Sequence, residues 1–152
     1  FVTKSSFHRV LEDDAYFKDN KLISLKKNNK IKKVVMCSGK IYYDLLEERE
    51  KTKTNDVVFV RLEQLYPFPA KTLAKVLKSY KTAKFIWCQE EPKNMGAWNT
   101  VRNYIDRTLE MINFKDSKVI FVGRSASSTT ATGNANKHLA QQKEILEKIL
   151  KH

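Results

Sequence analysis

The sequence predicts an α/β domain with three layers, in which helices cover both faces of a mostly parallel sheet. Three observations lead to this prediction. The chain has 152 residues, which is the length of one ordinary domain. Four short runs are apolar almost throughout, as strands buried on both faces are. Longer segments with helical spacing of apolar residues separate these runs, and right-handed crossovers then place helices on both faces of the sheet.

The first half of the chain supplies two of the expected strands and two helices. Residues 31–37 (IKKVVMC) and 57–62 (VVFVRL) are the strands. Between them, from residue 39 to about residue 53, apolar residues recur at helical spacing before a charged run, which indicates an amphipathic helix. Pro69 suits the first turn of the next helix. The apolar positions of that helix are Leu73, Val76, Leu77 and Tyr80.

The second half continues the alternation. Residues 84–89 (KFIWCQ) and 118–122 (KVIFV) are the third and fourth strands, and 90–96 and 123–133 are expected as loops. We also expect residues 7–11 to add a strand at an edge. Each of the last two helices shows one apolar face. These faces comprise Ala97, Val101, Ile105, Leu109 and Ile112 in one helix, and Leu139, Leu146, Ile149 and Leu150 in the other.

The chain carries a formal net charge of +12. Such a charge could attract nucleic acid or another acidic partner. However, Lys outnumbers Arg by 23 to 6, the Lys residues are scattered, and Asn and Ile are also frequent. This composition is typical of an AT-rich genome. The one Lys cluster, at residues 26–33, has no interleaved aromatic residue on which a base could stack. We therefore expect no nucleic-acid partner.

The apolar content points away from membranes and from disulfide frameworks. No window approaches the roughly 18 consecutive apolar residues that a membrane helix needs, so we expect no membrane partner. Cys37 and Cys88 are the two cysteines, and both lie in apolar runs, where a free cysteine behaves as a small hydrophobic residue. Neither a disulfide framework nor a four-cysteine zinc site is possible. An intracellular, reducing compartment fits.

Ligands of such sheets bind beyond the carboxyl ends of the strands, where the strand order reverses. If the 31–37 strand is central, this crevice lies between residues 38–40 and 89–91. Ser38 and Gly39 would open a helix whose N–H groups face an anion, and Lys40 would add charge. On the simpler interpretation, Ser38 only caps the helix and Gly39 only permits a tight turn. Neither a Rossmann nor a P-loop signature occurs.

Other polar residues give weaker signals for chemistry. Glu90 and Glu91 could split their pKa values as an acid–base pair, but adjacent loop residues usually point apart. Arg124 could bind a carboxylate or a phosphate, or make a domain contact. Trp87 and Trp98 are expected in the core or at a domain interface. The three histidines have no metal-ligand spacing, and we expect no metal site; they are His8, His138 and His152.

Four motifs carry a family resemblance. They read VMCSGKIYYDL from residue 35, VRLEQLYPFP from residue 60, WCQEEPKNMGAW from residue 87, and VGRSAS from residue 122. The last continues to Lys137-His138 and to residues 141–143. From about residue 31 to its end, the chain resembles the C-terminal end of the decarboxylating first component of the 2-oxoglutarate dehydrogenase complex. The absence of an initiator Met before Phe1 also favours a piece of a larger enzyme.

The resemblance implies a fold like that of the transketolase C-terminal domain, with a five-stranded mixed sheet and one antiparallel edge strand. Residues 1–30 would hold the edge strand and a linker to upstream domains, and 31–152 would form the α/β domain. The full-length enzyme would use thiamine diphosphate and Mg²⁺ to decarboxylate 2-oxoglutarate and would pass the succinyl group to a lipoyl group. Those cofactor sites lie in upstream domains of the family. We therefore expect no catalytic residue and no bound cofactor in this chain.

The resemblance also implies partners. These are the upstream thiamine-diphosphate-binding domains, a homodimer partner and the lipoyl acyltransferase core of the complex. A nucleotide or acyl-CoA effector would bind at the crevice; its candidate residues are Ser38, Gly39, Lys40, Gln89, Glu90 and Arg124. Two alternatives stay open: the same domain of a 2-oxoadipate dehydrogenase, and a free-standing effector-binding module. The compartment would be the bacterial cytoplasm or, in a eukaryote, the mitochondrial matrix.

Overall fold

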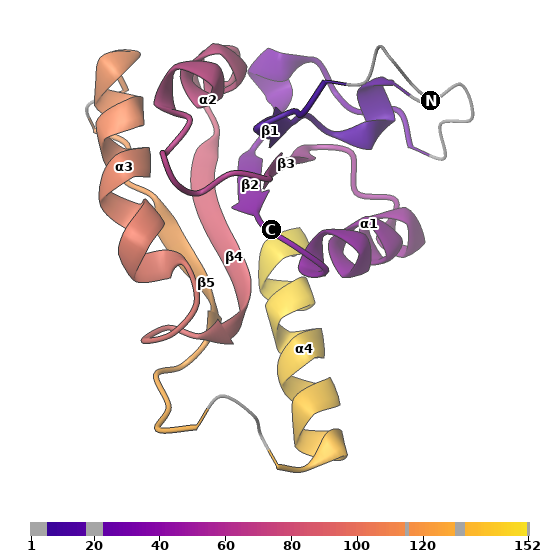
Figure 1. Cartoon of the computed structure of the whole chain (residues 1–152). Helices are drawn as coiled ribbons and strands as arrows, with labels where there is room; N and C mark the ends of the chain where they lie inside the picture. Colours follow the sequence, from indigo (N-terminus) through magenta and orange to yellow (C-terminus); the bar gives the residue numbers. More distant parts are fainter. Residues whose placement is uncertain (1–5, 18–22, 115, 130–132, 152) are drawn as a thin grey trace.

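One five-stranded sheet organises the computed structural model, which describes residues 6–17, 23–114, 116–129 and 133–151 (Figure 1). The strand order is β1-β3-β2-β4-β5. Within the described residues, the strands are β1 (Val10–Leu11), β2 (Lys33–Cys37), β3 (Val57–Leu62), β4 (Lys84–Pro92) and β5 (Ile120–Arg124). The helices are α1 (Ile41–Thr52), α2 (Ala70–Leu77), α3 (Trp98–Met111) and α4 (Ala135–Leu150).

The sheet is mixed, as expected. The pairs β2–β3, β2–β4 and β4–β5 are parallel, whereas the edge strand β1 runs antiparallel to β3, with Val10 opposite Leu62. The predicted antiparallel edge strand and the predicted central position of β2 are therefore confirmed. The strand order reverses at β2, because the chain moves from β2 to one side for β3 and to the other side for β4.

Four of the described strands differ in their bounds from the sequence prediction. Strand β2 begins at Lys33 rather than at residue 31. The edge strand is limited to Val10–Leu11, β4 continues to Pro92 rather than ending at residue 89, and β5 spans Ile120–Arg124 rather than 118–122. The extension of β4 is due to pairing, since Pro92 lies opposite Arg124 after an irregularity in the ladder. A polar run such as QEEP does not predict a strand by its pattern, and only the neighbouring strand holds it extended.

Alternating side chains of each strand feed two cores, one on each face of the sheet. Val34 and Met36 point into the core that α2 and α3 cover, whereas Val35 and Cys37 point into the core that α1 and α4 cover. Figure 1 shows the two helix pairs on opposite faces. The predicted three-layer arrangement is therefore confirmed.

The segment before β2 is also attached to the interior of the domain. The Asp13 carboxylate is fully buried, accepts a 2.8 Å hydrogen bond from Arg49 Nη2 and also accepts from the backbone N–H of Phe59 at 2.8 Å. The Arg49 guanidinium lies 4.5 Å from the centroid of the Phe59 ring. Because removal of either partner would leave a buried charge uncompensated, this pair fastens the N-terminal segment to α1 and β3. The predicted link from residues 1–30 to upstream domains stays a prediction.

Candidate functional site

The six residues of the predicted anion crevice do not form one site. Lys40 and Glu90 border one depression of about 280 Å³, Gln89 is buried, and Arg124 lines a different pocket. We call the first hollow the acidic depression. One end of it lies where the strand order reverses, at Lys40 after β2 and Glu90 in β4, and it continues between α1 and α4. Its ionisable lining residues are Lys40, Asp44, Glu47, Glu48, Lys51, Glu90 and His138.

The charge of the acidic depression does not suit an anion. Four carboxylates line it, against two lysines. Two of the carboxylates are held by one amide, because Gln142 Nε2 donates to Asp44 Oδ2 at 3.0 Å and lies 3.4 Å from Glu90 Oε1. The location at the switch point therefore agrees with the sequence argument, but the side chains around it favour a cation or a neutral group over an anion.

Gln89 serves the structure of the 90–98 segment. Its side chain is 4% exposed, and its Oε1 accepts hydrogen bonds from Trp87 Nε1 at 2.9 Å and from the backbone N–H of Trp98 at 3.1 Å. Its Nε2 lies within hydrogen-bond distance of three carbonyl oxygens, those of Glu91 at 3.2 Å, Pro92 at 3.1 Å and Met95 at 2.7 Å. A side chain engaged in this way is not available to a ligand.

The turn before α1 tests the two simpler interpretations, namely that Ser38 caps the helix and that Gly39 permits a tight turn. The helix begins at Ile41 with Lys40 in the N-cap position, and no side chain caps it, so the interpretation of Ser38 as the capping residue is wrong. Gly39 has a φ of +78°, and the expected tight turn at this glycine is confirmed.

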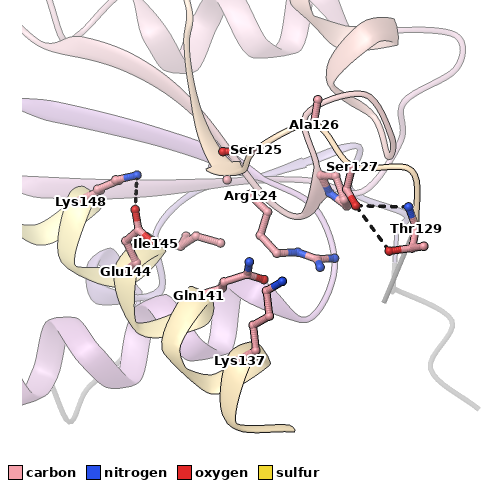
Figure 2. Close-up of a pocket in the computed structure, with 12 residues that line it drawn as sticks. Arg124, Ser125, Ala126, Ser127, Thr129, Lys137, Gln141, Glu144, Ile145 and Lys148 are labelled. Carbon is pink, nitrogen blue, oxygen red and sulfur yellow. Dashed lines mark hydrogen bonds and ion pairs between the residues drawn. The ribbon is translucent and has the colours of Figure 1, made fainter. Parts of the chain in front are cut away.

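Arg124 lies in a second hollow, which we call the basic pocket. It has a volume of about 270 Å³ and lies between the segment that follows β5 and one side of α4 (Figure 2). Arg124 Nε donates a 2.8 Å hydrogen bond to the carbonyl oxygen of Glu90, which anchors the side chain beside the irregular end of β4. The polar and charged residues that line the pocket are Arg124, Ser125, Ser127, Thr129, Lys137, Gln141, Glu144 and Lys148.

A glycine shapes the floor of the basic pocket. A Cβ built on Gly123 would lie 2.9 Å from the carbonyl oxygen of Gln89 and 2.6 Å from an atom of the Phe121 ring. The backbone of β5 therefore passes β4 so closely here that a side chain would push the strands apart. Gly123 lines the pocket together with its neighbours Arg124 and Ser125.

Two other groups of residues have structural roles. Trp87 and Trp98 are 1% and 5% exposed, which confirms their predicted place in the core. Cys37 and Cys88 are buried, and desolvation raises the pKa of the Cys37 thiol to about 12 and that of the Cys88 thiol further still. Both cysteines are therefore unreactive core residues, as the apolar runs predicted.

Within the described ranges, no group of three or more His, Cys, Asp or Glu residues is arranged to hold a metal ion. No helix in that part of the chain is both long and apolar enough to cross a membrane.

The topology and the two hollows define an α/β domain with possible ligand sites but no catalytic set among its described residues. A family model described as "2-oxoglutarate dehydrogenase C-terminal" matches residues 1–150. The chain therefore belongs to the family of 2-oxoglutarate dehydrogenase C-terminal domains, with which its transketolase-like fold is consistent.

Curated relatives agree with the family model. The chain is 52% identical over 147 residues to the "2-oxoglutarate dehydrogenase E1 component" of Brucella abortus (strain S19), and the match covers 97% of the chain and 15% of that relative. It is 51% identical to the proteins of the same name from Brucella anthropi and Brucella melitensis biotype 2, with the same coverage. The chain thus spans about 15% of the length of these relatives.

The α4 residues that line the basic pocket are not among the candidate residues predicted from the sequence. Lys137, Gln141 and Lys148 lie on one stripe of α4, together with Glu144, because residues four or seven apart share a helix face. Their spacing was readable in the sequence. What the sequence did not show was that this stripe faces the end of β5 rather than solvent.

Proposed function

We propose that the chain acts, within a longer protein, as the C-terminal interface domain of an enzyme that oxidatively decarboxylates 2-oxoglutarate and transfers the succinyl group to a lipoyl group. The observation that carries this proposal is the match of 97% of the chain to 15% of each relative named as a 2-oxoglutarate dehydrogenase E1 component. The 2-oxoadipate dehydrogenase and the free-standing module are not favoured, since the named relatives are all 2-oxoglutarate enzymes of much greater length.

In this proposal the cofactor is held elsewhere in the longer protein. There, thiamine diphosphate with Mg²⁺ would supply the chemistry that decarboxylates the 2-oxo acid. The described residues of this chain do not fit that group, because they offer no cluster of three metal-ligating side chains and the carboxylates Asp44 and Glu90 are bound to the Gln142 amide. We therefore assign no step of the reaction to this chain.

The partners we propose are the upstream domains of the same protein, a homodimer partner and a lipoyl acyltransferase core, with no nucleic acid. Two exposed aromatic residues support a docking role. Tyr66 is 86% exposed and follows β3, and Tyr43 is 60% exposed and lies in the first turn of α1. Large exposed aromatic side chains are typical of interfaces. The bacterial relatives favour the cytoplasm over the mitochondrial matrix.

A domain exchange tests the proposal. In the Brucella abortus relative, the matching C-terminal portion is replaced by this chain, and oxidation of 2-oxoglutarate is measured with an artificial electron acceptor. We expect the chimera to assemble and to retain activity, and we expect the 152-residue chain alone to show none.

The parent protein and a version truncated before the matching portion are the two controls. An assembled chimera without activity, a chimera that fails to assemble, or a truncated protein as active as the parent would contradict the proposal. Replacement of Tyr66 by Ala within the chimera tests the interface separately, because this exposed side chain contributes little to the fold of the domain itself.

A further inference from the structure

Many of the lysines gather at one end of the sheet. Two segments, residues 26–33 and 78–84, contain no acidic residue and hold eight of the 23 lysines: Lys26, Lys27, Lys30, Lys32, Lys33, Lys78, Lys81 and Lys84. About a tenth of the chain therefore supplies two-thirds of its formal net charge of +12. Seven of the eight are exposed, and Lys33 is half-buried. We call the surface formed by these eight residues the lysine face.

Tertiary contacts hold the two segments of the lysine face together. Strand β2 begins at Lys33 and β4 at Lys84, and these two residues are paired neighbours in the sheet. The backbone N–H of Lys84 donates to the carbonyl oxygen of Lys32 at 2.8 Å. Thr82 Oγ1 donates to the carbonyl oxygen of Asn29 at 3.2 Å, although these residues are 53 positions apart in the sequence. The lysine face is therefore a preformed surface at the amino ends of the central strands.

Most of the charge of the lysine face has no counter-charge among the described residues. Asp56 pairs with Lys26 and Lys32, and Lys33 Nζ donates to the carbonyl oxygen of Ile149 at the end of α4. In that part of the chain, no carboxylate lies within ion-pair distance of the other five lysines, namely Lys27, Lys30, Lys78, Lys81 and Lys84. Burial lowers the pKa of Lys33, and the charges of Lys84 and Lys32 lower it further, which shows that the cations repel one another.

The residue types of the lysine face favour carboxylates over nucleic acid or a membrane. All its cations are Lys, which bind as point charges, whereas nucleic-acid sites typically combine the guanidinium forks of Arg with aromatic rings that stack on bases. The one aromatic residue of the two segments, Tyr80, is 3% exposed, so it offers no ring to a base and no anchor to a membrane. Helix N-termini, which bind phosphate groups, lie at the opposite end of the sheet, where α1 follows β2.

We propose that the lysine face docks a segment of another protein that is rich in Asp and Glu. Complementary charge accelerates association and gives specificity, and flexible Lys side chains adapt to a run of carboxylates. This inference does not depend on the proposed function. Tyr43 and Tyr66, which support the proposed domain interface, follow strands at their carboxyl ends, so the acidic segment would bind at the opposite end of the sheet.

The test is a titration of the 152-residue chain with a decaglutamate peptide at constant ionic strength, followed by amide chemical shifts. We expect saturable shifts concentrated in residues 26–33 and 78–84. A triple variant with Lys27→Gln, Lys30→Gln and Lys81→Gln should weaken binding about tenfold, because it removes three exposed ion pairs with the peptide. The shift map of the unsubstituted chain tests the proposal without any substitution.

The matched control is a triple variant with Lys71→Gln, Lys75→Gln and Lys143→Gln. It lowers the net charge equally, and all three residues are exposed but lie outside the two segments. We expect it to weaken binding by less than about twofold, because distant exposed charges are screened. Circular dichroism checks that both variants fold. Equal weakening by the two variants would show attraction to the net charge alone and would overturn the proposal.

Two further outcomes would contradict the lysine face as a docking surface for an acidic segment. One is a set of shifts spread over the whole surface of the chain without saturation. The other is an oligothymidylate of equal charge that binds at the same residues more tightly than decaglutamate, which would assign the face to nucleic acid instead.

Discussion

The two hollows beside α4 are close neighbours with opposite character. The basic pocket is lined by one side of the helix, through Lys137, Gln141 and Lys148, and the acidic depression by another side, through His138 and Gln142. The buried residue Ile145 of α4 also lines the basic pocket. Glu90 connects the two hollows: it lines the acidic depression, where its carboxylate lies 3.4 Å from Gln142, and its carbonyl accepts a hydrogen bond from Arg124, which lines the basic pocket.

The comparison shows that the strand order and the side-chain charges are independent guides to the position of a ligand site. The acidic depression lies at the switch point, where the general rule for open α/β sheets expects a ligand. Two of its carboxylates, Asp44 and Glu90, nevertheless contact the Gln142 amide, whereas the basic pocket at the end of β5 is lined by three cationic side chains and one carboxylate. The topological rule gives the end of the sheet at which ligands bind. The side chains of α4 contribute to the charge of each hollow and so to the kind of ligand that it can bind.

The largest expected effect concerns Gln89, the buried residue that precedes Glu90 in β4. Gln89→Ala should lower the free energy of unfolding by about 3–4 kcal/mol, because it leaves the indole N–H of Trp87 and the backbone N–H of Trp98 without their buried acceptor. Gln142→Ala is the comparison at the acidic depression and should cost only about 0.5–1 kcal/mol, since that amide is partly exposed. Chemical denaturation measures both.

If Gln142→Ala destabilised the chain as much as Gln89→Ala, the amide at the acidic depression would contribute as much to the fold as the buried amide of Gln89. The proposed difference between a structural amide at Gln89 and a surface amide at Gln142 would then be wrong.

A smaller effect tests the charge of the basic pocket. Glu144→Gln removes its carboxylate and releases Lys148 from their 2.6 Å ion pair, so it should lower the free energy of unfolding by about 0.5–1 kcal/mol. Glu47→Gln breaks the equivalent pair with Lys51 at the acidic depression and changes the net charge equally. Chemical denaturation should show no loss for Glu47→Gln, because other carboxylates line that depression. A loss as large as that of Glu144→Gln would mean that the excess charge of each hollow has no effect on stability.

The smallest effect concerns the residue that the sequence placed in the anion site. Lys40→Gln should change the free energy of unfolding by less than about 0.5 kcal/mol, because Lys40 is an exposed residue at the rim of the acidic depression. The same denaturation experiment checks it beside Glu144→Gln. A loss as large as that of Glu144→Gln would mean that the carboxylates of the acidic depression hold Lys40 as firmly as Glu144 holds Lys148.

The sequence was sufficient for most of the fold and for part of the site. Apolar strands such as Val57–Leu62 and the apolar face of α3 have periods that report secondary structure directly. Arg124 was identified because it follows a strand. Lys137 and Gln141 were not, because an exposed polar stripe looks the same whether it faces solvent or a hollow. Arg49 was read as part of a charged run, although a buried carboxylate 36 residues earlier holds it in the core.

The sequence by itself determined the layers, the parallel central strands and the family, since these depend on local periodicity and on motifs that are contiguous in the chain. Only the tertiary structure decided how the candidate residues group. In that structure Gln89 lies in a buried hydrogen-bond network, Lys40 lines an acidic depression, and Arg124 lines the same pocket as Lys137. The physical reason is that the field at a site is the sum over side chains from several elements, and α4 brings its charges to the sheet from the far end of the chain.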